Sequence, residues 1–138
     1  MPARLLIVDD HEVVRLGLRA LFAKCDSFEI CGEAQNGIDA IRMVIDLSPD
    51  VVILDLTMPG MNGFEAAANI VTVAPAIRIV FFSAHEVPAS AHWVGADAFV
   101  SKSSALEDLL LTVGRVLKSS KIVRPQQKSM GATNASSQ

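Results

Sequence analysis

The sequence is poor in aromatic side chains and contains no long hydrophobic run. Its 138 residues include no tyrosine and one tryptophan, and aromatic residues make up 5% of the chain. Proteins that bind single-stranded nucleic acid stack bases on aromatic side chains, so this shortage disfavours that class. No stretch approaches the roughly 18 apolar residues of a membrane-spanning helix, and the short apolar stretch after Arg4 cannot form a signal-peptide core. We therefore expect a cytoplasmic protein with no membrane partner.

Cysteine and positive charge are also scarce. Cys25 and Cys31 are too few for a disulfide scaffold and lack metal-site spacing, which favours reduced thiols, with a disulfide as the alternative. Residues 1–118 hold all 15 acidic residues but only 9 of the 12 lysines and arginines, so their net charge is −6. Because nucleic-acid affinity comes mainly from cationic side chains that neutralise phosphates, we expect no direct nucleic-acid binding by this part. Cations are better suited partners.

Apolar residues are abundant, at 51% of the chain, with a mean hydropathy of +0.39. This composition, at this length, predicts one compact globular domain. After residue 118 the sequence becomes rich in serine, glutamine and asparagine. We therefore assign residues 1–118 to the domain and residues 119–138 to a flexible linker or tail.

Short aliphatic stretches alternate with segments of helical periodicity. The stretches predicted as strands are 5–8, 28–34, 51–54, 77–82 and 98–101. Apolar spacing predicts helices over about 14–25, 36–47, 62–73 and 104–118, and a short one within 86–94. Alternating strands and helices predict an α/β fold, a doubly wound sheet of five parallel strands with helices on both faces.

Two details of the helices are predicted from local patterns. Asn62 with Glu65, and Ser104 with Glu107, have the spacing of a capping box, so both pairs predict helix starts. In the second helix, the isoleucines at 38, 41 and 45 predict the face that packs on the sheet.

Polar residues follow four of the predicted strands. Asp9 and Asp10 follow the first strand and Asp55 the third, while Ser83 and Lys102 follow the fourth and fifth. In an open parallel sheet, ligands bind beyond the carboxyl ends of the strands. We therefore expect three acids, a hydroxyl and a lysine to converge at one edge of the sheet.

Such a cluster favours a divalent cation and phosphoryl chemistry. Carboxylates about 5 Å apart repel by roughly 3 kcal/mol per pair at an effective dielectric of about 20. Mg²⁺ suits an oxygen-rich site that also takes phosphoryl oxygens, whereas Zn²⁺ prefers histidine and cysteine. With the charge offset, one carboxylate can attack a phosphoryl group to form an acyl phosphate. Lys102 and Ser83 would then contact the phosphoryl oxygens.

Four stretches resemble the receiver domain of two-component response regulators, the CheY-like fold. They are 5–18 (LLIVDDHEVVRLGL), 32–37 (GEAQNG), 55–63 (DLTMPGMNG) and 95–102 (GADAFVSK). The first two resemble in particular the receivers of LuxR/FixJ (NarL-type) regulators. The resemblance covers residues 4–118 and implies the flavodoxin-like strand order 2-1-3-4-5.

The resemblance also implies a role for each residue of the cluster. Asp55 would accept phosphate from a sensor histidine kinase, in a reaction that needs Mg²⁺ and Lys102. The ligands of Mg²⁺ would be Asp9, Asp10, Asp55 and the backbone carbonyl of Thr57. The protein would be a phosphoacceptor switch and not an enzyme acting on other substrates.

Ser83 and Phe99 would form the switch, with Ser83 moving toward the phosphoryl group and Phe99 turning inward behind it. The interval from Ser83 to Lys102 is nearly one helical turn shorter than the family pattern. The resemblance therefore implies a homodimer formed on phosphorylation without predicting its geometry. Ser103 replaces the usual proline after Lys102. A separate DNA-binding effector domain is the expected output of a LuxR-type regulator.

Other functions have weaker support. A haloacid-dehalogenase-like phosphatase would need a second aspartate two residues after Asp55, where the chain has Thr57. No glycine-rich phosphate loop follows the first strand, which disfavours a nucleotide-binding protein. A binding module that uses the fold without phosphorylation would be expected to have lost some of the acids. The three histidines, His11, His85 and His92, are spaced too widely for a metal motif and are predicted as polar surface or loop residues.

Overall fold

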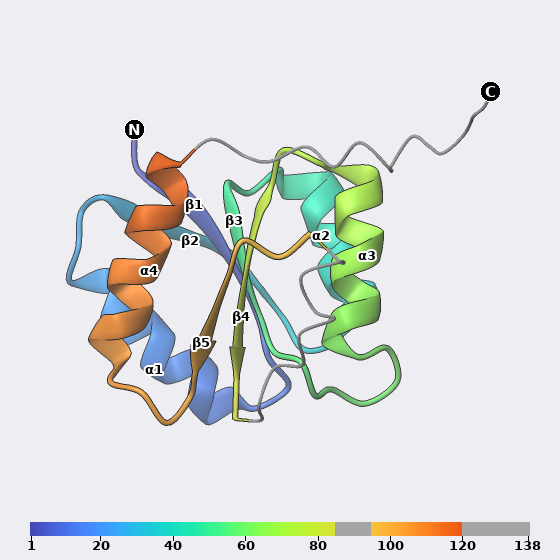
Figure 1. Ribbon diagram of the computed structural model, residues 1–138, viewed down its shortest axis with the longest axis horizontal. Coiled ribbons are helices and arrows are strands. Elements are labelled where there is room, and N and C mark those ends of the chain that lie inside the picture. The colour runs from blue at the N-terminus through green and yellow to red at the C-terminus, as the bar shows by residue number, and fades with distance from the viewer. Residues whose placement is uncertain (85–94, 120–138) are drawn as a thin grey trace, which may run out of the picture.

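The computed structural model describes residues 1–84 and 95–119. It contains a five-stranded parallel sheet in the order β2-β1-β3-β4-β5, which confirms the predicted topology (Figure 1). The strands are β1 (Ala3–Val8), β2 (Phe28–Ala34), β3 (Val51–Leu54), β4 (Arg78–Ser83) and β5 (Ala98–Ser101). The helix expected within 86–94 lies outside the described residues, as does the tail except for Ser119.

Four helices of the described part of the chain lie on the two faces of the sheet (Figure 1). They are α1 (Glu12–Ala23), α2 (Gly37–Leu47), α3 (Gly63–Val73) and α4 (Leu106–Lys118). Helices α1 and α4 cover one face, and α2 and α3 cover the other. None of these helices, within residues 1–84 and 95–119, is long and apolar enough to cross a bilayer.

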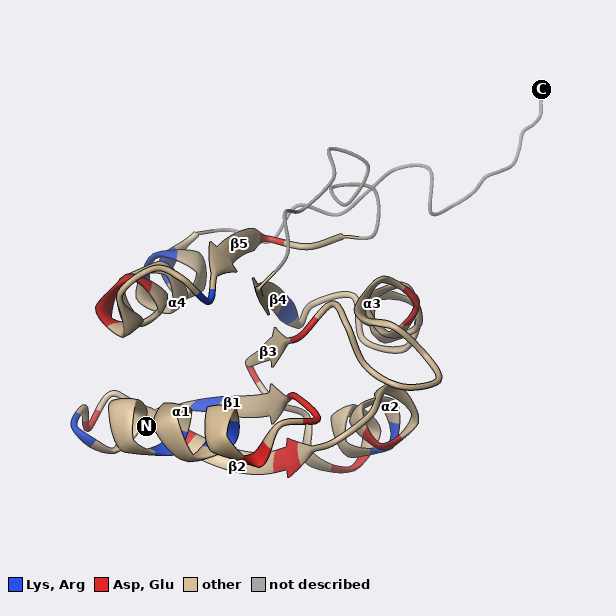
Figure 2. Cartoon of the chain, turned by 90° about the horizontal axis from the view of Figure 1, so that it is seen from below, with Lys and Arg blue, Asp and Glu red and all other residues tan. Residues whose placement is uncertain are grey.

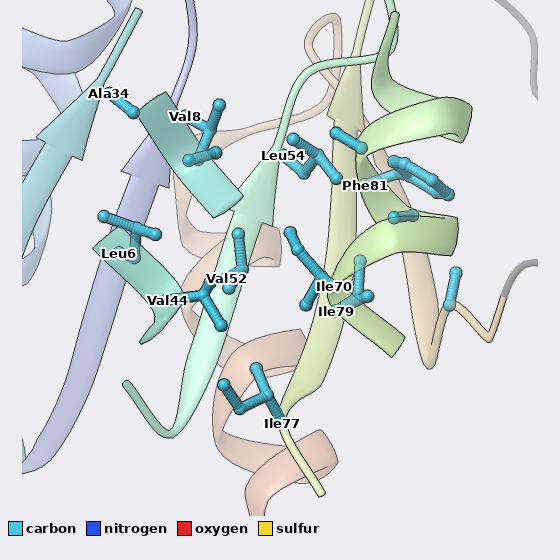
Figure 3. Packing of buried hydrophobic residues seen from close by; sticks show 14 of the residues in the cluster. Leu6, Val8, Ala34, Val44, Val52, Leu54, Ile70, Ile77, Ile79 and Phe81 are labelled. Carbon is cyan, nitrogen blue, oxygen red and sulfur yellow. The ribbon is translucent and has the colours of Figure 1, made fainter. Parts of the chain in front are cut away.

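The central strands are aliphatic because both of their faces are buried. In β1 and β3, side chains alternate between two core clusters: Leu6 and Val52 face α2 and α3, whereas Leu5 and Val51 face α1 and α4. Figure 3 shows the α2/α3 cluster, in which Ile70 of α3 packs against strand residues. Each aliphatic run therefore supplies two cores, and its first polar residue marks the point where the strand leaves them.

One predicted helix start is confirmed and one is wrong. The Asn62 side chain accepts the backbone N–H of Glu65 at 2.9 Å, and the Glu65 side chain accepts the N–H of Asn62 at 3.0 Å, completing a capping box. Ser104 does not cap α4, because its N–H donates to the Ser101 carbonyl in a turn and the helix begins one residue later, with Ala105 at the N-cap.

The predicted core face of α2 is also wrong for two of its three isoleucines, since only Ile41 packs, partly buried, against the core. Ile38 and Ile45 are 59% and 60% exposed, and the buried residues are Gly37, Ala40 and Val44. A Cβ on Gly37 would lie 2.8 Å from the Met61 sulfur, which shows how close the packing is. The helix therefore turns its small residues inward, although both stripes have the same period. In α4, the first residue, Leu106, is likewise exposed although it is apolar.

Candidate functional site

The site lies where β1 and β3 end side by side. Val8 and Leu54 are register partners, so the next residues, Asp9 and Asp55, extend beyond the sheet at the same level. The Asp55 N–H donates to the Val8 carbonyl at 3.0 Å, which continues the ladder to the aspartate itself. Figure 2 shows acidic segments directly beyond the arrowheads of both strands. Asp9 and Asp55 are only 2% and 3% exposed, so their carboxylates have lost most of their hydration.

Lys102 supplies positive charge to both carboxylates. Its Nζ lies 2.6 Å from Asp9 Oδ2 and 3.5 Å from Asp55 Oδ2. The backbone N–H of Lys102 donates to the Ser83 carbonyl at 2.8 Å, which fixes where the lysine leaves β5. Its ammonium also lies 5.9 Å from the centre of the Phe82 ring. Strands β4 and β5 therefore hold the Lys102 ammonium at the site.

Charge at the site is not fully compensated. Desolvation by burial raises the pKa of Asp55 above its ordinary value, and the negative charge of Asp9, with a smaller effect of Asp10, raises it further. Lys102 and the Thr57 N–H, which donates to Asp55 Oδ1 at 3.3 Å, oppose this rise in pKa without cancelling it. Removing or neutralising one of these negative charges would therefore favour the ionised form of Asp55.

One carboxylate oxygen of Asp10 is placed where a bound cation could contact it. Its Oδ1 is buried, and it accepts no hydrogen bond from the described residues, although it lies within ion-pair distance of His11. Ligand atoms of Asp9, Asp10, His11 and Asp55 all lie within 4.8 Å of one another. A buried carboxylate oxygen without a donor, in an oxygen-rich group of this size, fits a hard divalent cation.

The remaining predicted residues lie at or near the same edge. Ser83 is buried at the end of β4, opposite Ser101 of β5. Phe99 is half-buried and stacks on Phe81, with ring centres 5.6 Å apart and planes 18° apart. Thr57 is exposed and contacts Asp55 through its N–H, so the metal role of its carbonyl stays a prediction.

Two residues of the site were not anticipated from the sequence. Arg15 of α1 is buried; its Nη1 donates to the Asp9 carbonyl at 2.8 Å and its Nε to Glu33 Oε1 at 3.0 Å. His11 is exposed, as predicted, but its ring nitrogen also contacts Asp9 and Asp10. The available signals were an arginine next to the apolar stripe of α1 and a histidine directly after two aspartates.

Close packing holds the loop that follows Asp55. The N–H of Gly63 donates to the Leu56 carbonyl at 2.8 Å. A Cβ at position 63 would lie 2.2 Å from the Asp55 carbonyl oxygen, so only glycine leaves room for this backbone path. The start of α3 is thereby fixed against the strand end that carries the site.

An open parallel sheet of this order, with acids at the ends of two central strands and a lysine after the last strand, defines the class of CheY-like receivers. The sequence model of the response regulator receiver domain matches residues 5–114, and the chain belongs to that family. It is the receiver domain of a two-component response regulator, with LuxR- and NarL-type relatives.

Individual relatives agree with this assignment. The response regulator GacA of Pseudomonas aeruginosa is 30% identical over 126 residues, which cover 89% of this chain and 59% of GacA. The nitrate/nitrite response regulator NarL of Escherichia coli is 38% identical over 112 residues, covering 79% of this chain and 52% of NarL. A crystal structure of a LuxR-family response regulator from an Aurantimonas species has a TM-score of 0.82 at 33% identity, covering 91% of this chain and 92% of that one. The chain thus spans between half and three fifths of GacA and NarL.

Proposed function

We propose that Asp55 accepts a phosphoryl group from a sensor histidine kinase. The environment of its carboxylate supports this assignment best. Asp55 directly follows a central strand, it is almost fully buried, and the Lys102 ammonium lies 3.5 Å from its Oδ2. Asp55 also accepts a backbone N–H from the loop that follows it, that of Thr57, at 3.3 Å. This contact orients the carboxylate for use as a nucleophile.

In the proposed step, a carboxylate oxygen of Asp55 forms a bond to the donor's phosphorus. The bond from phosphorus to the imidazole nitrogen of the kinase's phosphohistidine breaks, and its electron pair stays on that nitrogen. The product is an acyl phosphate on Asp55. The Lys102 ammonium and the Ser83 hydroxyl donate to phosphoryl oxygens and stabilise the charge that develops on them.

Asp9, Asp10 and Asp55 would hold Mg²⁺, with the Thr57 carbonyl as a further oxygen ligand. When bound, Mg²⁺ supplies positive charge that offsets the carboxylates and the incoming phosphoryl oxygens. Asp9 is oriented for this role by Lys102 Nζ at 2.6 Å and by the His11 N–H at 2.9 Å. Asp10 contributes the buried oxygen that accepts no hydrogen bond within the described part of the chain.

The output of the switch would pass through Ser83 and Phe99. Ser83 moves toward the phosphoryl group, and Phe99 turns into the space that Ser83 leaves. We place this receiver in a cytoplasmic LuxR-type transcription regulator that acts through a separate DNA-binding domain and a homodimer formed on phosphorylation. Its chemistry is limited to its own phosphorylation and dephosphorylation.

Intact-mass spectrometry tests the proposal. Incubation with acetyl phosphate and Mg²⁺ should add one phosphoryl group to the wild-type chain, and either a chelator or the substitution Asp55→Asn should abolish the addition. Ser83→Ala is the matched control within the site: it should still be labelled while binding to the phosphorylation-dependent partner weakens. Labelling of Asp55→Asn at the wild-type level would refute the assignment.

A further inference from the structure

His11 occupies the N-cap position of α1 without capping the helix. Its backbone is extended, with φ −97° and ψ 116°, and its side chain makes no hydrogen bond to the first turn. The residues preferred at this position are serine, threonine, aspartate and asparagine, whose side chains accept such a bond. The imidazole instead turns to the acids, with Nδ1 3.1 Å from Asp9 Oδ1 and 3.1 Å from Asp10 Oδ1.

These distances match the spacing of ligand atoms around one cation. Two donors that each lie about 2.1 Å from a metal are roughly 3.0 Å apart at a right angle and about 3.4 Å apart at the tetrahedral angle. The separations of 3.1 Å from Nδ1 to each carboxylate oxygen fall between these limits. The Asp10 oxygen of this group is the buried atom that accepts no hydrogen bond from the described residues.

The imidazole of His11 changes which cations this cluster of acids is expected to prefer. Mg²⁺ prefers oxygen ligands and keeps its waters, whereas Co²⁺, Ni²⁺ and Zn²⁺ bind imidazole well and bind such mixed sites more tightly along the series of divalent metals. Asp9, Asp10 and Asp55 provide the oxygens that either kind of cation would use.

We propose that His11 Nδ1, with the Asp9 and Asp10 carboxylates, forms a nitrogen–oxygen site that binds Ni²⁺, Co²⁺ or Zn²⁺ in competition with Mg²⁺. The proposal rests on the proposed Mg²⁺ site, because the two cations share the carboxylates of Asp9 and Asp10. The side chain of His11 is 63% exposed, so the ring is accessible from solvent. The sharing makes the magnesium-loaded fraction of the receiver depend on the concentration of transition metal.

Calorimetric titration of the tag-free chain with NiCl₂ and, separately, with MgCl₂ tests the proposal. The variant His11→Asn keeps a residue preferred at an N-cap and removes the imidazole. It should weaken Ni²⁺ binding about tenfold or more while changing the Mg²⁺ dissociation constant by no more than about threefold. Ni²⁺ should also raise the apparent Mg²⁺ dissociation constant of the wild type in proportion to its own concentration.

The other two histidines provide the matched control, because adventitious Ni²⁺ binding would use any of the three. The double variant His85→Asn/His92→Asn should keep the wild-type Ni²⁺ affinity. In ¹⁵N spectra of the imidazoles, Zn²⁺ should shift the Nδ1 resonance of His11, and Mg²⁺ should not.

Three results would overturn the proposal: Ni²⁺ affinity unchanged in His11→Asn, equal losses of Ni²⁺ and Mg²⁺ affinity, or a His11 resonance that Zn²⁺ does not move. Equal losses would mean that His11 only orients the acids through its hydrogen bond to Asp9. Failure of the proposed function is a separate result, since it would appear as wild-type Asp55 that Mg²⁺ does not help to phosphorylate.

Discussion

The two ends of the sheet differ in how their charged side chains are paired. At the amino end, the Arg4 guanidinium donates to the Leu47 and Ser48 carbonyls, and the Arg4 N–H donates to Asp50 Oδ2 at 2.8 Å. At the carboxyl end, three carboxylates lie close together, and Lys102 pairs with two of them, Asp9 and Asp55. One of them, Asp10, has a buried oxygen that accepts no hydrogen bond from residues 1–84 and 95–119.

The difference separates a stabilising charge arrangement from a functional one. Arg4 lies at the C-terminal end of α2, where the helix dipole and unpaired carbonyls favour a cation. At the carboxyl end, the Asp55 carboxylate is crowded and desolvated, which raises its pKa, and Asp10 has the buried oxygen that lacks a hydrogen bond from the described residues. A ligand of positive charge can supply what is missing at this end, which is why we place the chemistry there.

The largest expected effect concerns the lysine at the carboxyl end. Lys102→Met removes the ammonium that lies 2.6 Å from Asp9 and 3.5 Å from Asp55 while keeping an apolar stem of similar length. Loss of one charged donor to the phosphoryl oxygens should slow phosphorylation by acetyl phosphate about 100- to 1000-fold. The rate is measured by intact-mass spectrometry at saturating Mg²⁺. A rate within threefold of the wild type would show that Lys102 only pairs with the acids.

A smaller effect is expected at the amino end, and it concerns stability. Arg4→Ala leaves the last carbonyls of α2 without their cationic donor, so the free energy of unfolding should fall by about 2 kcal/mol. Urea unfolding measures this loss, with Arg42→Ala on the exposed side of α2 as the control that should change little. The phosphorylation rate of Arg4→Ala should stay at the wild-type value. A slower rate with unchanged stability would contradict the division between the two ends.

The smallest effect tests the crowding itself. Because the pKa of Asp55 is raised in the folded state, its ionisation destabilises the folded chain as pH rises from the unfolded-state value, about 4, through the raised value. In chelator, Asp55→Asn should therefore be more stable than the wild type at pH 7, with little difference below about pH 4. Urea unfolding of both proteins at each pH provides the comparison. A variant that is less stable at pH 7 would show that Asp55 is well compensated by Lys102.

Much of this contrast could be predicted from the sequence. The apolar stretches predicted all five strands to within two residues at either end. The signal is clearest in β3, whose four residues are all aliphatic and buried, and weaker in the edge strand β2, which contains Glu29 and Glu33. The same reasoning predicted that Asp9, Asp10, Asp55 and Lys102 would meet, since parallel strands end at one edge. The residues that directly follow the strands therefore predict which side chains meet at the edge of the sheet.

What could not be predicted depends on contacts between distant segments. The inward face of α2 is decided by how closely Gly37 approaches Met61, and two stripes of equal period were available. The burial of Arg15 depends on Glu33 of β2 and on the Asp9 carbonyl. The direction of the His11 ring is a choice between capping α1 and contacting the acids, which the residue type alone does not determine.

A crystal structure of the chain grown with Mg²⁺ and beryllofluoride would show whether the carboxyl edge of the sheet is the phosphorylation site. We expect a cation bound to the Asp9, Asp10 and Asp55 carboxylates and a beryllofluoride group on Asp55, within hydrogen-bond distance of Lys102 Nζ. Density for neither group at this edge, or a beryllofluoride bound to a different aspartate, would contradict it.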